Sequence, residues 1–311
     1  MIIQKIKKTV TKKEMLTMSK IRIITDSGSD ITVERAKELD IRLIPISFTF
    51  DGENYYREGI DISVDDFYDK LKKSADTPKT TQVTPIGFAD VYNEEYDNGY
   101  DTLIVVTISS TGSGMNQNAR MAASEVMDER GGEIIVIDSM GYSALYGLPV
   151  TYAAKMLKEG KSKDEIVSFL EDAIPSMKAR FLVDDLLHLK KGGRINAATL
   201  VIANMLDIKP VLAIKDGVVV QQDKLRGSKK IFKKLIESAL DDDFEFDGKT
   251  VLVPYTGNRE RGEELMDALK DEFENINPVP YQVGAVIGCH GGPGLVGFIV
   301  SEKYDFLDYE G

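Results

Sequence analysis

Apolar and polar residues follow two kinds of pattern along this chain, and the two kinds alternate. Short, almost continuously apolar runs occupy residues 21–26, 101–109 and 133–139. Longer segments between them carry apolar residues at helical spacing, which predicts helices with one buried side. Continuous apolar strands that alternate with helices are typical of a parallel sheet covered on both faces. We therefore predict an α/β domain in the first half of the chain.

The predicted helices have ordinary start and stop signals. Asp30 or Thr32 suits the N-cap of the first helix, and Ser63 suits the N-cap of the second. Gly131 and Gly132 end a helix that begins near residue 116. In this half we expect strands at 21–26, 41–50, 101–109 and 133–139, and helices at 31–39, 63–74, 86–99, 116–130 and 140–160.

After residue 160 the pattern becomes mixed, and we expect a second α/β domain. Its predicted elements are helices at 161–179, 228–240 and 258–273, a hairpin turned at 215–217, and strands within 249–257 and 278–301. No linker separates the two halves. We divide the chain into an N-terminal extension (1–19), an N-terminal α/β domain (20–160) and a C-terminal α/β domain (161–311). A ligand site is expected in the cleft between the domains.

Composition narrows the class of protein. The 39 lysines and arginines against 51 acidic residues give a net charge of −12, which argues against general nucleic-acid binding. Cys289 is the only cysteine, so no disulfide forms within the chain, and the two histidines leave little for a metal cluster. No run approaches the roughly 18 apolar residues of a membrane span. These features predict a cytoplasmic protein without a metal or other cofactor.

Three polar loops follow buried strands: "DSGSD" from residue 26, "SSTGSG" from residue 109 and "DSMGYS" from residue 138. The carboxyl ends of parallel strands share one edge of a sheet, so these loops are expected to converge there. In the second loop, hydroxyls and backbone N–H groups at a helix start suit an anion, although a simple helix-capping turn explains them too. Asp26 and Asp30 are predicted to act as a strand-end acid and a helix cap rather than as magnesium ligands.

Other polar residues are candidates for a binding site. Thr80, Thr81 and Gln82 lie in a stretch predicted to be irregular, where a surface turn is the simpler interpretation. His290, within the glycine-rich "GCHGGPG", is either structural or part of a site, whereas His188 is predicted to be structural. The arginines that suit anion contact are Arg194 after two glycines and Arg226, for which ordinary surface exposure is the default.

Known catalytic signatures are missing from these candidates. The sequence contains no Walker loop and no nucleophile elbow. A nucleophile–base pair is hard to assemble from two histidines and one cysteine that is surrounded by apolar residues in the sequence. Hydroxyls, a histidine and arginines instead describe a receptor for a carboxylate or phosphate. We therefore predict no catalytic residues.

Taken together, the motifs resemble the DegV family of bacterial fatty-acid-binding proteins from about residue 21 onward. The resemblance rests on "ITDSGSDIT", "PKTTQVTP", "ISSTGSG", "IDSMGYSALYG", "LLHLKKGGRI", "IKPVL" and "GCHGGPG", in that order. Four positions depart from the usual family pattern: Thr81 stands for Ser, Val83 for Pro, and Gly112 and Met115 for Leu and Thr. These departures leave the preferred acyl chain open.

The resemblance implies two α/β domains with one long-chain fatty acid buried between them. It assigns the carboxylate to Thr80, Ser110 and His290, with Thr81 and Ser109 as neighbouring alternatives. Arg194 and Arg226 would serve anion contact or partner docking. The implied function is a non-enzymatic carrier that presents its fatty acid to a fatty acid kinase, which makes an acyl phosphate for phospholipid synthesis.

Two further hypotheses remain open. A phosphate-handling enzyme, such as a small-molecule kinase or hydrolase, would use the Gly/Ser-rich loops. An anion-sensing regulatory module would instead bind a ligand and alter a partner's activity. For the carrier, burial of each CH₂ contributes about 0.8 kcal/mol, so the guest requires a deep apolar tunnel with a polar end.

Overall fold

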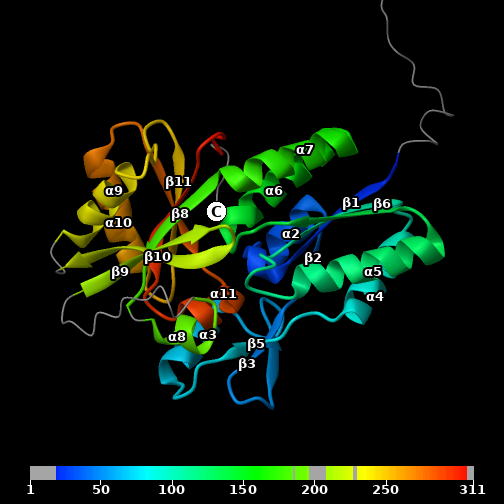
Figure 1. Cartoon of the computed structure of the whole chain (residues 1–311), viewed down its shortest axis with the longest axis horizontal. Helices are drawn as coiled ribbons and strands as arrows, with labels where there is room; N and C mark the ends of the chain where they lie inside the picture. The colour runs from blue at the N-terminus through cyan, green and yellow to red at the C-terminus, as the bar shows by residue number, and fades with distance from the viewer. Residues whose placement is uncertain (1–18, 185, 196–207, 227–229, 307–311) are drawn as a thin grey trace, which may run out of the picture.

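Four parallel strands form the sheet of the first lobe, in the order β2-β1-β6-β7 (Figure 1). The strands are β1 (Ile21–Asp26), β2 (Ile41–Ile44), β6 (Thr102–Thr107) and β7 (Glu133–Asp138). Every residue of β6 is buried, which explains its continuous apolar run. The computed structural model describes residues 19–184, 186–195, 208–226 and 230–306. Most of the predicted extension, residues 1–18, lies outside these ranges.

Helices contribute their apolar faces to the core of this sheet. They are α2 (Val33–Leu39), α4 (Pro85–Asp97), α5 (Met115–Arg130), α6 (Ala144–Lys158) and α7 (Lys163–Ala173). Thr32 accepts from the backbone N–H of Arg35, so the predicted N-cap of α2 is confirmed. α7 lies beyond the expected domain boundary at residue 160, yet Ile166 and Leu170 belong to the core of the first sheet.

The predicted strand 41–50 is wrong as a single element. Pro45 interrupts it, because proline has no N–H for the ladder. The chain continues in a second, three-stranded sheet of β3 (Ser47–Thr49), β4 (Tyr55–Arg57) and β5 (Lys79–Thr80), in the order β4-β3-β5. Helix α3 (Val64–Lys73) packs against it, and Ser63 caps this helix as predicted. The stretch predicted to be irregular therefore contains the short strand β5.

The second lobe has a six-stranded mixed sheet in the order β10-β9-β8-β13-β11-β12. Its strands are β8 (Met177–Leu182), β9 (Ile208–Lys215), β10 (Val218–Arg226), β11 (Thr250–Tyr255), β12 (Asn277–Gln282) and β13 (Val296–Ser301). Helices α9 (Ile231–Leu240) and α10 (Arg259–Glu272) pack against one face. The predicted hairpin turn at 215–217 is confirmed, because β9 and β10 pair across it.

One predicted helix in this half is too long, and another helix was missed. The helix expected at 161–179 ends at Ala173, a 3₁₀ turn (Ile174–Ser176) contains Pro175, and the chain then enters β8. The strands predicted within 278–301 are confirmed as β12 and β13, but helix α11 (Ala285–Gly291) between them was not predicted. A short helix, α8 (Leu187–Lys191), carries His188. Residues 196–207 lie outside the described residues.

Helix α6 joins the lobes because it is apolar on both sides. Tyr146, Val150 and Ala153 face the first core, whereas Leu145 and Leu148 pack with residues of the second sheet. Figure 1 shows α6 and α7 beside the upper end of β8, between the two sheets. Two α/β lobes with a parallel N-terminal sheet flanked by helices are the predicted fold class, and the structure confirms it.

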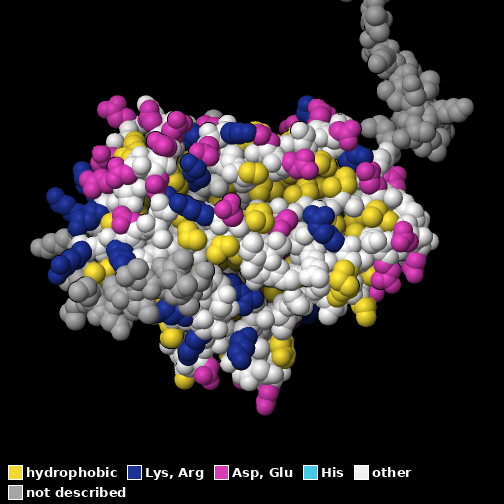
Figure 2. Space-filling model, in the orientation of Figure 1, with side chains coloured by type: hydrophobic (Ala, Val, Ile, Leu, Met, Phe, Trp, Pro, Cys, Tyr) yellow, Lys and Arg dark blue, Asp and Glu magenta, His cyan; other side chains and the backbone are white. Residues whose placement is uncertain are grey.

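Charge is distributed unevenly over the surface. Figure 2 shows acidic side chains concentrated at the upper left of the visible face, over α9 and α10. Among the described residues, no helix is both long and apolar enough to span a membrane.

Candidate ligand-binding cavity between the lobes

A cavity of about 440 Å³ lies where the two lobes and the three-stranded sheet meet. Its volume falls within the roughly 300–1,000 Å³ that is usual for small-molecule sites. Most of the lining is apolar and comes from both lobes: Ile46, Ile108, Leu145, Ala179, Phe181, Leu189, Ile214, Val219, Pro254, Val283, Val286, Ile287, Leu295, Phe298 and Ile299. Such a surface suits a hydrocarbon group.

One side of the cavity is polar. Thr80 Oγ1 lies 3.0 Å from His290 Nε2, and Arg194 Nε donates to the Gly112 carbonyl at 3.0 Å. Thr80 belongs to β5, His290 to the last turn of α11, and Arg194 follows α8, so distant segments meet here. We call Thr80, Arg194 and His290 the polar wall. Thr81 also lines the cavity, so the structure brings four of the predicted site residues together.

Burial keeps the His290 imidazole neutral. Desolvation, with smaller contributions from Arg194 and His188, lowers the pKa of His290 to about 4. At neutral pH one ring nitrogen carries hydrogen and the other accepts. The Nδ1 atom is buried and has no hydrogen-bond partner among the residues that the structure describes. An arriving carboxylate would therefore meet a guanidinium, a hydroxyl and a neutral imidazole, which is a suitable set for one anionic group.

Ser109 and Ser110 do not line the cavity. The Ser109 hydroxyl donates to the carbonyl of Gly217, at the tip of the β9–β10 hairpin, over 3.1 Å. Thr111 and Tyr142 hydroxyls contact the same carbonyl, the latter at 2.8 Å. The exposed Ser110 hydroxyl lies 4.0 Å from Met140 Sδ, and its backbone N–H donates to Asp138. In this arrangement the "SSTGSG" loop fastens the second lobe to the first.

Two further residues of the predicted polar stretches, Gln82 and Ser113, line the cavity. Ser143, which the sequence did not single out, lines it too. Within the "SSTGSG" loop, Ser113 is the hydroxyl residue nearest to the start of α5. Arg226, at the exposed end of β10, is not among the residues lining this cavity, and neither is His188. Assignment of the carboxylate to Ser110 and of anion contact to Arg226 stays a prediction.

The three polar loops converge as predicted. Asp26 accepts from the backbone N–H groups of Gly28 and Ile108, and the N–H of Ser143 donates to the Gly28 carbonyl at 2.8 Å. Asp26 thus caps the 3₁₀ turn after β1, in keeping with the strand-end interpretation. It also accepts from the Tyr146 hydroxyl at 2.7 Å.

Three buried carboxyl groups lie beside the cavity, and we call Asp26, Asp30 and Glu58 the acid cluster. Glu58 accepts from the backbone N–H of Ala285, at the start of α11, and Asp30 accepts from the Ser143 hydroxyl. A Cβ on Gly284 would collide with the Glu58 carboxylate and lie 2.6 Å from Asp30 Oδ1, so the two acids are neighbours.

Burial governs the protonation of the acid cluster. Desolvation raises the pKa of Asp26 to about 6 and that of Asp30 to about 7. Desolvation, with the nearby Asp30 charge, also raises the pKa of Glu58 well above its usual range. Among the described residues, none of the three forms an ion pair with lysine or arginine, and no group of His, Cys, Asp and Glu is arranged to hold a metal ion. None of the three lines the cavity, so the phosphate-handling alternative gains no support from them.

Fold and site together define a two-lobed α/β protein with a mainly apolar cavity between its lobes and polar residues on one side of that cavity. The chain also matches the model of the DegV family, described as "Uncharacterised protein, DegV family", over residues 20–303. It is 35% identical to a DegV domain-containing protein of Caldanaerobacter subterraneus, over 92% of this chain and all of that one. The chain belongs to the DegV family.

Several solved structures with the same architecture are described as fatty-acid-binding proteins. A DegV family protein from Thermus thermophilus, described as fatty-acid binding, matches with a TM-score of 0.80 and 29% identity, over 91% of this chain and 99% of that one. A stearic-acid-binding protein from Eubacterium ventriosum matches equally well, at 0.80 and 29%, over 90% and 98%. DegV of Bacillus subtilis, a fatty-acid-binding protein, matches at 0.77 and 30%, over 91% and 100%.

Proposed function

We propose that this protein binds one long-chain fatty acid in the cavity between its lobes, as a carrier rather than an enzyme. The observation that carries the proposal is the pairing of an apolar cavity with one polar wall. An acyl tail gains about 0.8 kcal/mol for each CH₂ that it buries. Its ionised head needs compensation, because an unpaired buried charge costs several kcal/mol. The family relationship to fatty-acid-binding proteins supports the same ligand class.

The polar wall supplies the compensation for the head group. In the proposed complex the carboxylate accepts from the Thr80 hydroxyl and lies beside Arg194 and His290, with Thr81 close by. Arg194 keeps its planar guanidinium charged at any physiological pH. The family resemblance also assigns Ser110 to the carboxylate, with Ser109 as its neighbouring alternative, and for these to reach the cavity their loop would have to release Met140 and Gly217 respectively.

We propose further that the bound carboxylate is presented to a fatty acid kinase for acyl-phosphate formation. Thr80, Arg194 and His290 also line an outer groove of about 560 Å³, on the other side of the polar wall. A carboxylate held by these residues is therefore separated from the outside by a single layer of side chains. In the reaction, a carboxylate oxygen would attack the terminal phosphorus of ATP and ADP would leave. A role in phospholipid synthesis and a cytoplasmic location are part of this proposal.

Thr80→Val tests the head-group assignment. It keeps the shape of the side chain and removes the hydroxyl, so delipidated protein is expected to bind palmitate about tenfold more weakly. Thr77→Val is the matched control, because Thr77 lines only the outer groove and is similarly half-buried. Fluorescence displacement or calorimetry measures both affinities. Equal palmitate affinity of Thr80→Val and the wild type would remove Thr80 from the site.

The kinase step is tested separately. Palmitate-loaded protein is incubated with a purified bacterial fatty acid kinase, ATP and Mg²⁺, and hydroxylamine traps any acyl phosphate as a hydroxamate. Hydroxamate is expected only when both proteins are present. Its absence, with palmitate binding intact, would reject the presentation step and leave the carrier function standing.

A further inference from the structure

The interlobe cavity has two boundaries of opposite character. Its polar wall is shared with the outer groove described above. On another side it adjoins a second groove, of about 590 Å³, and the residues that line both spaces are Leu145 and Ile214. We call this pair the apolar wall. Within the described part of the chain, no residue belongs to both walls. The cavity therefore has one polar boundary and one apolar boundary.

The apolar wall is made by one side chain from each lobe. Leu145 is in the first turn of α6, and Ile214 lies on β9 just before the hairpin tip. Leu145 is 6% exposed, and both side chains contribute to the cluster formed with Met177 and Ala179 of β8. Both side chains therefore lie within one packed cluster at the boundary between the two spaces.

The groove beyond the wall continues the apolar surface. Next to the wall it is lined by Ile137 of β7, Leu170 and Ile174 at the end of α7, and Met177 of β8. Its charged residues are Asp138 at the end of β7, Asp216 at the hairpin tip, Arg120 of α5 and Glu171 of α7. A hydrocarbon chain that passed Leu145 and Ile214 would find further apolar contacts.

We propose that Leu145 and Ile214 set the length of acyl chain that the protein accepts, an inference that rests on the proposed fatty-acid binding. The carboxylate is fixed at the polar wall, so the methyl end of the chain points to the opposite, apolar boundary. Affinity rises by about fourfold for each CH₂ that finds apolar surface. Once the methyl end reaches the apolar wall, each further CH₂ must bend the chain or displace packed side chains, and the gain ends.

Leu145→Ala is the direct test, with Leu189→Ala as its matched control. Both leucines are buried and line the cavity, but Leu189 does not border the second groove. Affinities of delipidated protein are measured for myristic, palmitic, stearic, arachidic and behenic acids. Leu145→Ala is expected to move the optimum toward arachidic and behenic acids, with a gain on the order of tenfold for these two over the wild type. Leu189→Ala is expected to leave the position of the optimum unchanged.

A second pair of variants keeps the test decisive. Ile214→Ala opens the same wall from the other lobe and is expected to reproduce the shift, whereas Leu145→Phe thickens the wall and is expected to favour myristic acid. An unchanged optimum in folded Leu145→Ala and Ile214→Ala, with palmitate still bound, would overturn the proposal alone. Failure of the wild type to bind any of the five acids would instead reject the proposed function.

Discussion

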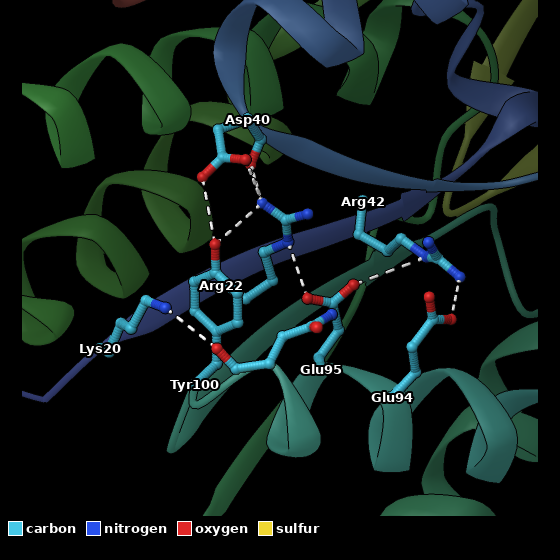
Figure 3. Close-up of polar contacts among 8 residues, drawn as sticks. Lys20, Arg22, Asp40, Arg42, Glu94, Glu95 and Tyr100 are labelled. Atoms are coloured by element: carbon cyan, nitrogen blue, oxygen red, sulfur yellow. Dashed lines mark hydrogen bonds and ion pairs between the residues drawn. The ribbon is translucent and has the colours of Figure 1, made fainter.

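Two regions of the molecule bury carboxylates, and they treat them in opposite ways. In the first lobe Glu95 of α4 is fully buried, with Arg22 Nε at 3.1 Å and Arg42 Nε at 3.6 Å from its two oxygens (Figure 3). These arginines come from the adjacent strands β1 and β2. Arg22 also donates to the Asp40 carbonyl at 3.0 Å. A charged group is thus surrounded by charges of opposite sign.

At the junction of the lobes, no lysine or arginine in the described part of the chain forms an ion pair with the acid cluster. Its neighbours are hydroxyls and backbone N–H groups, together with the phenols of Tyr68 and Tyr146. Protonation rather than ion pairing therefore reduces the cost of burial here.

Glu95 and the acid cluster therefore differ in role: Glu95 is structural, whereas the acid cluster changes its charge with pH. Glu95 ties a helix to two strands of one sheet, and its contacts do not involve the cavity. Glu58 instead holds the start of α11, the helix that carries His290 at its other end and lines the cavity through Val286 and Ile287. Ion pairs thus hold a helix against the first sheet, whereas the region beside the cavity retains carboxyl groups whose charge changes with pH.

The largest expected effect comes from Glu95→Ala. It leaves two guanidinium groups next to an uncharged pocket, so the free energy of unfolding is expected to fall by about 3–5 kcal/mol. Urea denaturation measures the change. If the free energy of unfolding fell by less than about 1 kcal/mol, the buried ion pairs of Glu95 would contribute little, and the proposed difference from the acid cluster would be wrong.

A pH effect is expected next, from Asp30→Asn. Because the pKa of Asp30 is raised to about 7 in the folded protein, the wild type loses stability as pH rises from about 4 through 7. The variant mimics the protonated acid and loses less, by on the order of 2 kcal/mol between about pH 5 and 8. Urea unfolding at both pH values provides the comparison.

Asp61→Asn is the control variant, because the pKa of Asp61 is shifted in the opposite direction to that of Asp30. Its exposed carboxylate has a pKa lowered to about 2, chiefly by hydrogen bonding to Arg57, so its contribution is constant above about pH 5. Identical pH profiles for Asp30→Asn and the wild type would contradict the view that the acid cluster takes up protons.

A smaller change is expected at His290. In ligand-free protein its pKa is lowered to about 4, and a carboxylate at the polar wall favours the charged imidazolium. Palmitate is therefore expected to raise the pKa of His290 by about one unit or more, which NMR of the imidazole protons detects. With two histidines in the chain, a His188→Gln variant assigns the signals. A pKa that does not move on loading would place the carboxylate elsewhere.

The smallest effect on stability is expected from Glu94→Ala, which changes the residue next to Glu95. Glu94 also pairs with Arg42, but its side chain is 53% exposed. Water screens such a pair, so the free energy of unfolding is expected to change by less than about 1 kcal/mol. A loss equal to that of Glu95→Ala would show that burial does not distinguish the two glutamates.

The sequence predicted those parts of the fold that periodicity determines. The buried strands β1, β6 and β7 were evident as apolar runs, and the convergence of their loops followed from the geometry of a parallel sheet. Strand β8 was missed because its residues alternate weakly after a strong helix, although Pro175 marked the change.

Helix α11 was missed because its glycines suggested irregular backbone. Their spacing held a signal, since Gly284, Gly288 and Gly292 fall on one helical face. A Cβ on Gly288 would lie 2.5 Å from the Tyr68 hydroxyl, so glycine is required for close packing of α11 on α3. Such tertiary approach leaves little trace in local sequence pattern.

Family resemblance identified Thr80, Thr81, Arg194 and His290, all of which line the cavity. The contribution of Ser143 and the position of Glu58 could not be predicted, because they depend on loop conformation and on contacts across the lobes. The use of Ser109 to bind the Gly217 carbonyl has the same origin, since the two residues lie in different lobes.

A crystal structure of the delipidated protein reloaded with palmitic acid tests the central claim most directly. Continuous density is predicted for one acyl chain between the lobes, with its carboxylate within hydrogen-bonding distance of Thr80 Oγ1 and its methyl end against Leu145 and Ile214. A cavity filled by the protein's own side chains, or palmitate bound only outside it, would contradict the account.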